Sequence, residues 1–524
     1  MFINGLKETL NEEFNYSVTE NGALGYRTTG KELLDINFAV TSMRSWDDGR
    51  IADKFARVFF ENRLLAIKWL FYARDAREGI GERRLFRIAL KDLGNSQPDI
   101  CRAIVPLVPE YGRWDDLWCL IGSRLHHDVL ELVAKQLSED IQNMKDGKPI
   151  SLLAKWMPST NTSSKETRKL AKMFVKAIGV DERTYRKLLS KLRAYLKVVE
   201  VNMSKKEWSA IDYSAVPSRA NLIYNKAFLR NDEERRREYL GKLQKGEAKI
   251  NASVLFPHDI VHKYTGGGDI VHKDLDITIE ELWKALPDYV QGAGNVICVA
   301  DGSGSMTSSV GGTKVSALDV ANALAIYFAE RSSGQFKDTY ITFSERPQLV
   351  YLSRGKTLRE KIEIALRHDE VANTNIEAVF ELILTTAVKN GMKQEDLPQT
   401  ILILSDMEFD GCARMSGGGE AYTDWFGRRR YCLSRPDKRL FEVIAQRYAE
   451  HGYKLPRLVF WNICSRTGTI PVKENDLGVA LVSGFSPAIV KMVLSNSTDP
   501  FECLLEQLNS ERYSAVEEAV KQVI

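Results

Sequence analysis

The residues best suited to chemistry lie in the stretch Asn-Val-Ile-Cys-Val-Ala-Asp-Gly-Ser-Gly-Ser-Met, residues 295–306. Asp301, Ser303 and Ser305 recur on every second residue, and the glycines between them allow the backbone to turn tightly. Such alternation can aim three hard oxygen donors at one point. Because only one of the three carries a formal charge, the set suits Mg2+ or Mn2+ that keeps some of its water. In isolation, however, a pentamer of this kind is more often a Gly/Ser-rich turn with an Asp cap.

Two later stretches favour the metal site over the simple turn. The apolar run 401–404 ends in Ser405-Asp406, as residues 296–300 end in Asp301, and both runs suit strands that are covered on both faces of a parallel sheet. Thr374 directly precedes an amphipathic segment, 376–387. Ligands of open α/β sheets bind at the carboxyl ends of the strands, so these side chains are expected to converge.

The elements around these residues predict an α + α/β chain with two domains. Residues 274–524 alternate strands with helices, which predicts a doubly wound α/β domain with an insertion at about 409–437. Residues 1–273 show mostly helical periodicity, which predicts an array of antiparallel, HEAT-like helix pairs. The expected strands are 295–301, 338–344, 400–406, 456–463 and 478–483, and the helices between and after them are 314–331, 376–390, 437–451 and 486–495.

The insertion contains Gly417-Gly418-Gly419, Trp425 and Arg428-Arg429-Arg430. Because it follows Asp406 closely, it is expected beside the metal site. Two interpretations stay open for it, a loop that binds a protein or a nucleic acid and a disordered surface insertion.

The most lopsided charge in the chain lies between Lys165 and Lys197, where the acidic residues are Glu166, Asp181 and Glu182. A phosphate backbone would be attracted to such a surface, and interleaved tyrosines could stack on unpaired bases. The alternative is a solvated helix face with buried tyrosines. The candidate RNA-binding residues are Lys165, Arg168, Lys169, Lys172, Arg186, Lys187 and Arg193.

Composition limits the setting of these sites. The 524 residues are 44% hydrophobic and 27% charged with a net charge of +3, so a nucleic-acid surface requires local segregation of charge. The 7 cysteines form no Cys-x-x-Cys pair, which indicates a reducing compartment. The amino terminus lacks the apolar core of a signal peptide, and no apolar run is long enough for a membrane span. We expect a cytoplasmic monomer without membrane contact.

The sequence Asp-x-Ser-Gly-Ser-Met after an apolar strand, a Thr before a helix and a second strand that ends in Asp together resemble a von Willebrand factor A domain with a metal-ion-dependent adhesion site. The resemblance implies that Ser303, Ser305 and Thr374 are direct ligands of the metal. It implies that Asp301 and Asp406 bind through water, or that one of them binds directly. It also implies that a partner supplies a carboxylate to the vacant coordination position.

Two further stretches, Arg77-Glu78-Gly79-Ile80-Gly81-Glu82-Arg83 and Tyr111-Gly112-Arg113-Trp114-Asp115-Asp116-Leu117, resemble motifs of the Ro ribonucleoprotein (TROVE-module) family. The segments 152–163 and 212–218 are more similar still to domain of unknown function 2828. The Ro resemblance implies helical repeats closed into a ring by the A domain. It also implies binding of small structured RNAs and RNA ends.

These observations lead to one main functional prediction and two alternatives. The main prediction is a non-enzymatic, Ro-like RNA-binding protein with a Mg2+ (or Mn2+) adhesion site. The first alternative is a metal-dependent protein-interaction scaffold without RNA. The second, a metal-dependent hydrolase, lacks support because none of the 7 histidines lies in the site motifs and no Gly-x-x-x-x-Gly-Lys-[Ser/Thr] loop occurs. We therefore expect a protein that is not an enzyme.

Overall fold

The computed structural model describes residues 10, 14–268, 270–290, 295–311, 313–343, 346–369, 375–410, 421–423, 429–431, 440–473, 475, 477–493 and 497–524. The chain forms two compact units. The sheet unit comprises Met1–Trp46, Phe256–Asp276 and Pro287–Leu508, and the helical unit comprises Asp47–Leu255, Ile277–Leu286 and Asn509–Ile524. This division differs from the expected boundary after residue 273, because the first 46 residues belong to the sheet unit and the segment from Asn509 belongs to the helical unit.

The sheet unit is built on a six-stranded sheet in the order β10-β9-β6-β3-β4-β5. All neighbouring strands pair in parallel except β4 and β5, which are antiparallel. The chain leaves β3 towards β4 and β5 and then returns to the other side of β3 with β6, so the direction of winding switches between β3 and β6. The strands are β3 (Val296–Asp301), β4 (Thr339–Phe343), β5 (Gln348–Tyr351), β6 (Thr400–Ser405), β9 (Arg457–Asn462) and β10 (Val479–Ser483).

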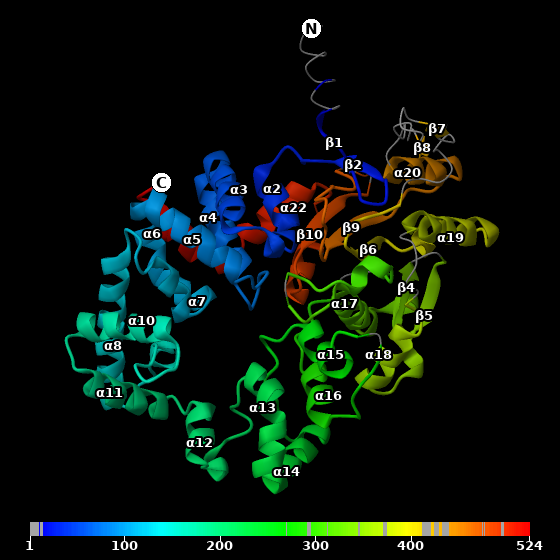
Figure 1. Cartoon of the computed structure of the whole chain (residues 1–524). Helices are drawn as coiled ribbons and strands as arrows, with labels where there is room; N and C mark the ends of the chain where they lie inside the picture. Colours follow the sequence, from blue (N-terminus) through cyan, green and yellow to red (C-terminus); the bar gives the residue numbers. More distant parts are fainter. Residues whose placement is uncertain are drawn as a thin grey trace. The chain divides into compact units, whose positions relative to one another are not determined.

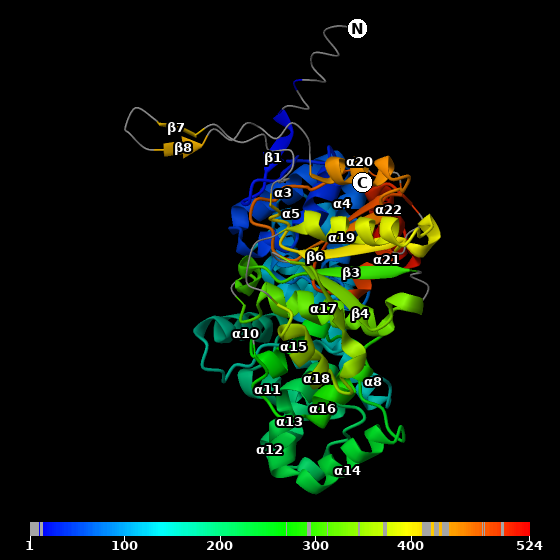
Figure 2. The ribbon, with the colours of Figure 1, turned by 90° about the vertical axis from the view of Figure 1, so that its right-hand side faces the viewer.

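Helices cover both faces of this sheet (Figures 1 and 2). Phe460 and Trp461 are successive residues of β9, so their side chains point to opposite faces. The ring of Phe460 contacts Phe441 of α20, and the ring of Trp461 contacts Phe328 of α17. The helices of this unit are α2 (Glu32–Ala39), α15 (Pro257–Thr265), α17 (Ala317–Arg331), α18 (Leu358–Leu366), α19 (Ile376–Lys389), α20 (Leu440–Glu450), α21 (Val490–Val493) and α22 (Pro500–Leu508).

The predicted strands and helices of this unit match the structure within a few residues, and the sequence prediction omits β5 and α18. Of the insertion, residues 409–410 are described together with a separate antiparallel pair, β7 (Ala421–Thr423) and β8 (Arg429–Tyr431). The rest of the predicted loop, with its glycines and tryptophan, lies outside the described residues. Both interpretations of the insertion therefore stay open.

The helical unit consists of short helices joined by turns, as its periodicity predicts. The finer description of these helices as HEAT-like repeats stays a prediction. They are α3 (Asp48–Glu61), α4 (Arg63–Arg74), α5 (Arg84–Ser96), α6 (Pro98–Ile104), α7 (Val108–Tyr111), α8 (His126–Lys145), α9 (Leu153–Trp156), α10 (Lys165–Ile178), α11 (Glu182–Tyr195), α12 (Val199–Lys205), α13 (Ser218–Asn231), α14 (Glu233–Gln244), α16 (Ile277–Lys284) and α23 (Ser514–Val520).

A buried ionic network joins the second motif of the helical unit, residues 111–117, to α4 and α5, the helices on either side of the first motif, residues 77–83. Asp116 is fully buried and accepts hydrogen bonds from Arg74 Nε and from Arg87 Nε, each at 2.7 Å. Asp115 pairs with Arg87 at 2.8 Å and with Arg113 at 2.5 Å. The side chain of Arg74 is only 5% exposed, so its charge depends on Asp116 for compensation.

The last residues of the chain complete the same unit. The fully buried carboxylate of Asp75 accepts a 2.8 Å hydrogen bond from Arg512 Nε, and the hydroxyl of Tyr111 donates to the Arg512 carbonyl at 2.7 Å. The ring of Tyr513 stacks on Tyr111 with centroids 5.7 Å apart. Because a buried carboxylate without its partner is costly, residues 511–513 are part of the fold of this unit.

Across the parts of the chain that the structure describes, none of the helices combines the length and the apolar character needed to cross a membrane.

We expect Asp116→Asn to lower the free energy of unfolding by about 3–5 kcal/mol, because it leaves the buried Arg74 guanidinium without its counter-charge. Urea unfolding followed by far-UV circular dichroism measures this loss. The matched control is Asp99→Asn, which removes an 80% exposed partner of Arg102 and should change stability by no more than about 0.5 kcal/mol. Equal losses of unfolding free energy in the two variants would show that the buried network stabilises the protein no more than an exposed ion pair does.

Candidate functional sites

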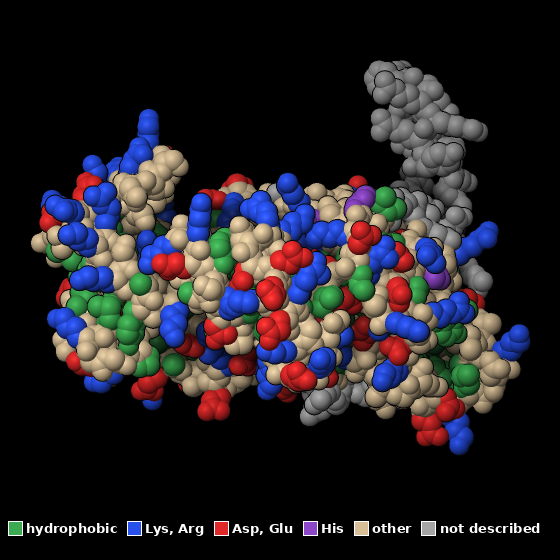
Figure 3. Space-filling view, turned by 90° about the horizontal axis from the view of Figure 1, so that it is seen from below, with side chains coloured by type: hydrophobic (Ala, Val, Ile, Leu, Met, Phe, Trp, Pro, Cys, Tyr) green, Lys and Arg blue, Asp and Glu red, His purple; other side chains and the backbone are tan. Residues whose placement is uncertain are grey.

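The basic run of the helical unit lies on α10 and α11. Ser164 caps α10 by accepting a hydrogen bond from the Thr167 N–H, and Gly179 ends the helix in the left-handed conformation. Asp181 then caps α11 by accepting from the Arg183 and Thr184 N–H groups. Lys and Arg side chains gather at the left of Figure 3, the side on which α10 and α11 lie in Figure 1.

The predicted RNA-binding residues divide into two groups. Arg168 Nη1 donates to the Thr162 carbonyl at 2.8 Å, and Arg193 Nε donates to the Ala154 carbonyl at 2.8 Å. These two guanidinium groups therefore stabilise local backbone. The other predicted residues are exposed, and they are Lys165, Lys169, Lys172, Arg186 and Lys187.

Three acidic residues, Glu166, Asp181 and Glu182, accompany the basic residues of this surface. Asp181 is occupied by the cap of α11, and Glu166 accepts a hydrogen bond from the Ser164 hydroxyl at 3.0 Å. Glu182 lies 3.7 Å from Lys172 Nζ. Within the described part of the chain, the side chains of Lys165, Lys169, Arg186 and Lys187 have no ion-pair partner.

The two tyrosines of this region are not equivalent. Tyr185 is fully buried and its hydroxyl donates to the Pro158 carbonyl at 2.8 Å, so it belongs to the core. Tyr195 is 38% exposed and its hydroxyl donates to the Lys148 carbonyl at 2.8 Å. Only Tyr195 presents a ring that a base could reach.

The second candidate site lies at the carboxyl ends of β3 and β6 in the sheet unit. Asp301 is the last residue of β3, and Asp406 directly follows β6, the strand paired with β3. Both carboxylates are almost fully buried. Ser405 Oγ donates to Asp301 Oδ2 at 2.6 Å, so the two strand ends are bonded to each other. The structure thus brings together the side chains that end the two predicted strands.

The serines of the Asp-Gly-Ser-Gly-Ser loop complete this strand-end cluster, which we define as Asp301, Ser303, Ser305, Ser405 and Asp406. The Ser303 N–H donates to Asp301 Oδ1 at 2.9 Å, and the hydroxyls of Ser303 and Ser305 lie 3.0 Å apart. Ser303 is buried, whereas Ser305 is partly exposed. The oxygens thus converge as the alternation in the sequence predicts.

Electrostatic repulsion is built into the strand-end cluster. Burial, together with the charge of Asp406, raises the pKa of Asp301 to about 7. Burial also raises the pKa of Asp406, although a hydrogen bond with Ser305 opposes that shift. The two carboxylates and the neutral hydroxyls beside them form a set of hard oxygen donors. A divalent cation bound among them would favour the ionised form of both carboxylates.

Arg466 and Glu408, which the sequence analysis did not select, lie beside this cluster. Arg466 Nη2 lies 3.2 Å from Asp406 Oδ2 and 2.9 Å from Glu20 Oε2. The buried carboxylate of Glu408 accepts from the N–H groups of Glu20 at 2.8 Å and of Arg466 and Thr467 at 2.9 Å. Its position two residues after Asp406 was a possible signal, whereas nothing in the sequence around Arg466 indicates its contact.

These contacts give the amino-terminal segment a place in the site. Its hairpin, β1 (Tyr16–Val18) and β2 (Leu24–Tyr26), forms bridges from Gly22 to Asp410 and from Tyr26 to Ile470. The Thr19 hydroxyl donates to the Phe409 carbonyl at 2.6 Å. The hairpin therefore packs against the segments that follow β6 and β9, next to Asp406.

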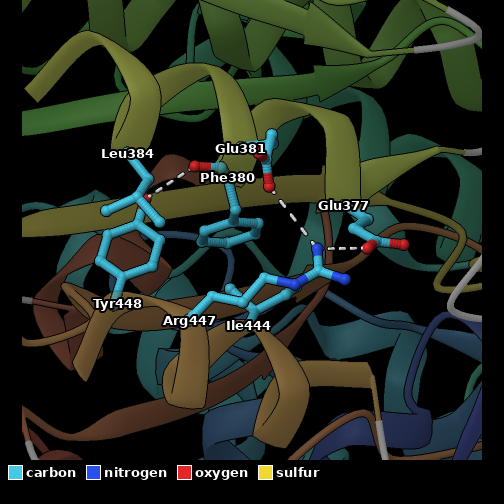
Figure 4. A pocket seen from close by; sticks show the side chains of 7 residues that line it. All are labelled: Glu377, Phe380, Glu381, Leu384, Ile444, Arg447 and Tyr448. Carbon is cyan, nitrogen blue, oxygen red and sulfur yellow. Dashed lines mark hydrogen bonds and ion pairs between the residues drawn. The ribbon is translucent and has the colours of Figure 1, made fainter. Parts of the chain in front are cut away.

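Thr374, the remaining predicted metal ligand, lies outside the described residues. The helix after it is firmly held. Asn375 caps α19 by accepting from the Ala378 N–H, and Arg447 of α20 forms an ion pair with Glu377 (Figure 4). The Tyr448 hydroxyl donates to the Phe380 carbonyl at 3.0 Å. These contacts hold the first turn of α19 in place.

Among the residues that the structure describes, no group of three or more His, Cys, Asp or Glu side chains is arranged to hold a metal ion. The strand-end cluster has two carboxylates and otherwise hydroxyls. This donor set fits Mg2+ or Mn2+, which accept oxygen ligands and retain water, better than metals that prefer nitrogen or sulfur.

Comparisons with known proteins place these features in a family. Residues 161–296 match the Domain of unknown function (DUF2828), which confirms that predicted resemblance, and residues 295–523 match the Domain of unknown function (DUF7788). The chain resembles the structure titled "Crystal structure of Deinococcus radiodurans RO (RSR) protein" with a TM-score of 0.42 and 15% identity, over 90% of this chain and 94% of that one. A likeness of that strength does not transfer a function, and the assignment of the sheet unit as a von Willebrand factor A domain stays a prediction.

The chain is 30% identical over 536 residues to "Uncharacterized protein L728" of Acanthamoeba polyphaga mimivirus, a match that spans 94% of this chain and 87% of that protein. The chain therefore belongs to the same protein family as the mimivirus protein L728.

Proposed function

We propose that this protein is a non-enzymatic RNA-binding protein whose sheet unit carries a divalent-metal site of the von Willebrand factor A adhesion type. The observation that carries the RNA proposal is the surface of α10 and α11, where, among the described residues, the exposed Lys165, Lys169, Arg186 and Lys187 have no ion-pair partner. Unneutralised Lys and Arg side chains attract phosphates and release counterions on binding. Because the sequence resembles Ro proteins, small structured RNA is the polyanion that should be tested first.

The metal proposal rests on the strand-end cluster. Ser303 and Ser305 would bind Mg2+ or Mn2+ directly, together with Thr374, and Asp301 and Asp406 would bind it directly or through water. When bound, the cation supplies a positive charge that can accept a carboxylate from a partner. Arg466 already contributes a positive charge on the Asp406 side of the cluster. The same cluster would serve the alternative function, a metal-dependent scaffold that binds a protein and no RNA.

We expect the charge-reversal variant Lys169→Glu, Lys172→Glu, Arg186→Glu and Lys187→Glu to lose most of its affinity for structured RNA. Losing four phosphate contacts should also lower the slope of log K against log salt concentration by roughly 3–4. Filter binding or fluorescence anisotropy over a series of salt concentrations measures both effects.

The control reverses four exposed cations elsewhere in the helical unit, Lys226, Arg230, Lys245 and Lys249, and so makes the same change in net charge. This control should keep the RNA affinity and most of the salt slope. If both variants bind RNA as the unchanged protein does, α10 and α11 are not the RNA surface. If the unchanged protein binds no RNA at all, the scaffold function is favoured.

We expect MgCl2, added after treatment with EDTA, to raise the Tm of the unchanged protein, because an ion that binds only the folded state stabilises it. Asp301→Asn keeps the size of the side chain but removes its charge. It should abolish this response and, in EDTA, should not lower the Tm much, since it also removes the repulsion from Asp406. Differential scanning calorimetry measures both quantities.

The control for the metal experiment is Asp35→Asn, a buried acid of the same unit that accepts from Thr29 and has no contact with the cluster. This variant should be less stable but should keep the full increase in Tm with Mg2+. An Asp301→Asn protein that still responds to Mg2+ would place the bound ion elsewhere.

A further inference from the structure

A cavity of the sheet unit is lined by residues that do not belong to the strand-end cluster. It has a volume of about 450 Å3 and lies between the end of β5, the short 3-10 turn Leu352–Arg354 and α18. This volume falls within the range of about 300–1,000 Å3 that is typical of small-molecule sites. Its lining includes Tyr351, Arg354, Lys356, Arg367 and His368.

The acidic side chains of this cavity are already engaged. Glu360 forms the capping box of α18, since its Oε2 accepts from the Lys356 N–H at 2.6 Å and from the Thr357 N–H at 3.2 Å. These bonds lower the pKa of Glu360 and keep its charge at the start of the helix. Glu363 pairs with Arg359 at 2.9 Å. Both carboxylates are thus held at fixed positions, and the lining keeps three cations against these two acids.

The basic side chains of the cavity interact less closely with acids, although the charge of Lys356 contributes to the lowered pKa of Glu360. Arg354, Lys356 and Arg367 are exposed, and among the described residues none of the three side chains has an ion-pair partner. The Arg354 guanidinium lies 6.0 Å from the centroid of the Tyr351 ring. The cavity thus has an excess of positive charge in the form of donors that suit phosphate oxygens.

Two further side chains limit the kind of anion that fits. His368 Nδ1 lies 2.7 Å from the Ile364 carbonyl, which can only accept, so Nδ1 carries the proton and Nε2 is left as an acceptor. Tyr351 is 47% exposed and offers a flat ring at the rim of the cavity. In a ligand with both a phosphate and a planar heterocycle, the phosphate would contact the cations, a sugar hydroxyl or base amino group would donate to the imidazole, and the heterocycle would stack on the ring.

The backbone that carries these groups is tightly fixed. Gly355 is buried between Arg354 and Lys356, and a Cβ at this position would lie 2.9 Å from Lys361 Cγ and 3.0 Å from Lys361 N. Because the loop packs this closely on α18, Arg354 and Lys356 project from a defined position and do not rely on a mobile loop.

We propose that this cavity binds a nucleoside phosphate, either as a free nucleotide or as the phosphorylated end of an RNA. Its phosphate would pair with Arg354, Lys356 and Arg367, and its base would stack on Tyr351. The proposal does not depend on the RNA surface of α10 and α11, because every residue involved belongs to the sheet unit.

Isothermal titration calorimetry with AMP, adenosine and inorganic phosphate tests this proposal on the full chain. AMP should bind, and inorganic phosphate should bind more weakly. The affinity for adenosine should be lower than that for AMP by roughly a hundredfold or more, because adenosine lacks the charged group. The triple variant Arg354→Ala, Lys356→Ala and Arg367→Ala should bind neither AMP nor phosphate. Tyr351→Ala should lower the affinity for AMP by about tenfold and leave the affinity for inorganic phosphate unchanged.

The matched control is Lys389→Ala, an exposed lysine at the end of α19 outside this cavity, which should bind AMP as the unchanged protein does. A 5′-phosphorylated RNA oligonucleotide that competes with AMP, while its 5′-hydroxyl counterpart does not, would identify an RNA end as the source of the phosphate. AMP binding that survives the triple variant, equal binding of adenosine and AMP, or no binding of either AMP or phosphate would each overturn the proposal.

Discussion

The burial of two carboxylates at the ends of adjacent parallel strands is the constraint on which the sheet unit depends. Asp301 and Asp406 meet where the winding of the sheet changes direction, and each raises the cost of ionising the other. Hydroxyl and amide donors from Ser303, Ser305 and Ser405 offset part of that cost, as does the guanidinium of Arg466. A site that holds two carboxylates together is costly for stability alone, and this cost is the physical reason for the proposal that it binds a cation.

The same constraint explains why the start of the chain belongs to the sheet unit. Asp406 is followed by Met407, whose φ of 64° is unusual for a residue other than glycine, and this turn directs Glu408 into the protein. A buried Glu408 needs donors, and the hairpin supplies the Glu20 N–H while the segment after β9 supplies those of Arg466 and Thr467. In the helical unit, Arg512 likewise compensates the buried Asp75 from the far end of the chain. In both units a buried carboxylate is thus hydrogen-bonded by a segment that is distant in the sequence.

The sequence was sufficient for features that short-range patterns determine. Apolar runs that end in Asp301 and Asp406 predicted two strands and the meeting of their ends, and helical periodicity predicted α10 and α11. It was insufficient where a contact joins positions far apart, as for Arg466 with Glu20, because no local spacing encodes such a pair. Charge alone also could not separate Arg168 and Arg193, which bind backbone carbonyls, from the exposed lysines beside them. The edge strand β5 and the helix α18 were not predicted because both are short. In addition, β5 is exposed on alternate residues and so lacks a continuous apolar run.

The distribution of acids, more than their number, decides where this nearly neutral chain is positive. A net charge of +3 predicts no strong field, yet many carboxylates are held in place by local hydrogen bonds and act mainly on the cations nearest to them. Asp181 caps α11, Glu360 caps α18 and Asp116 compensates buried arginines. The basic surface of α10 and α11 combines this arrangement with a local excess of Lys and Arg residues, and the lining of the cavity beside α18 has three cations against two acids. Local composition and helix capping together therefore decide where both surfaces are positive.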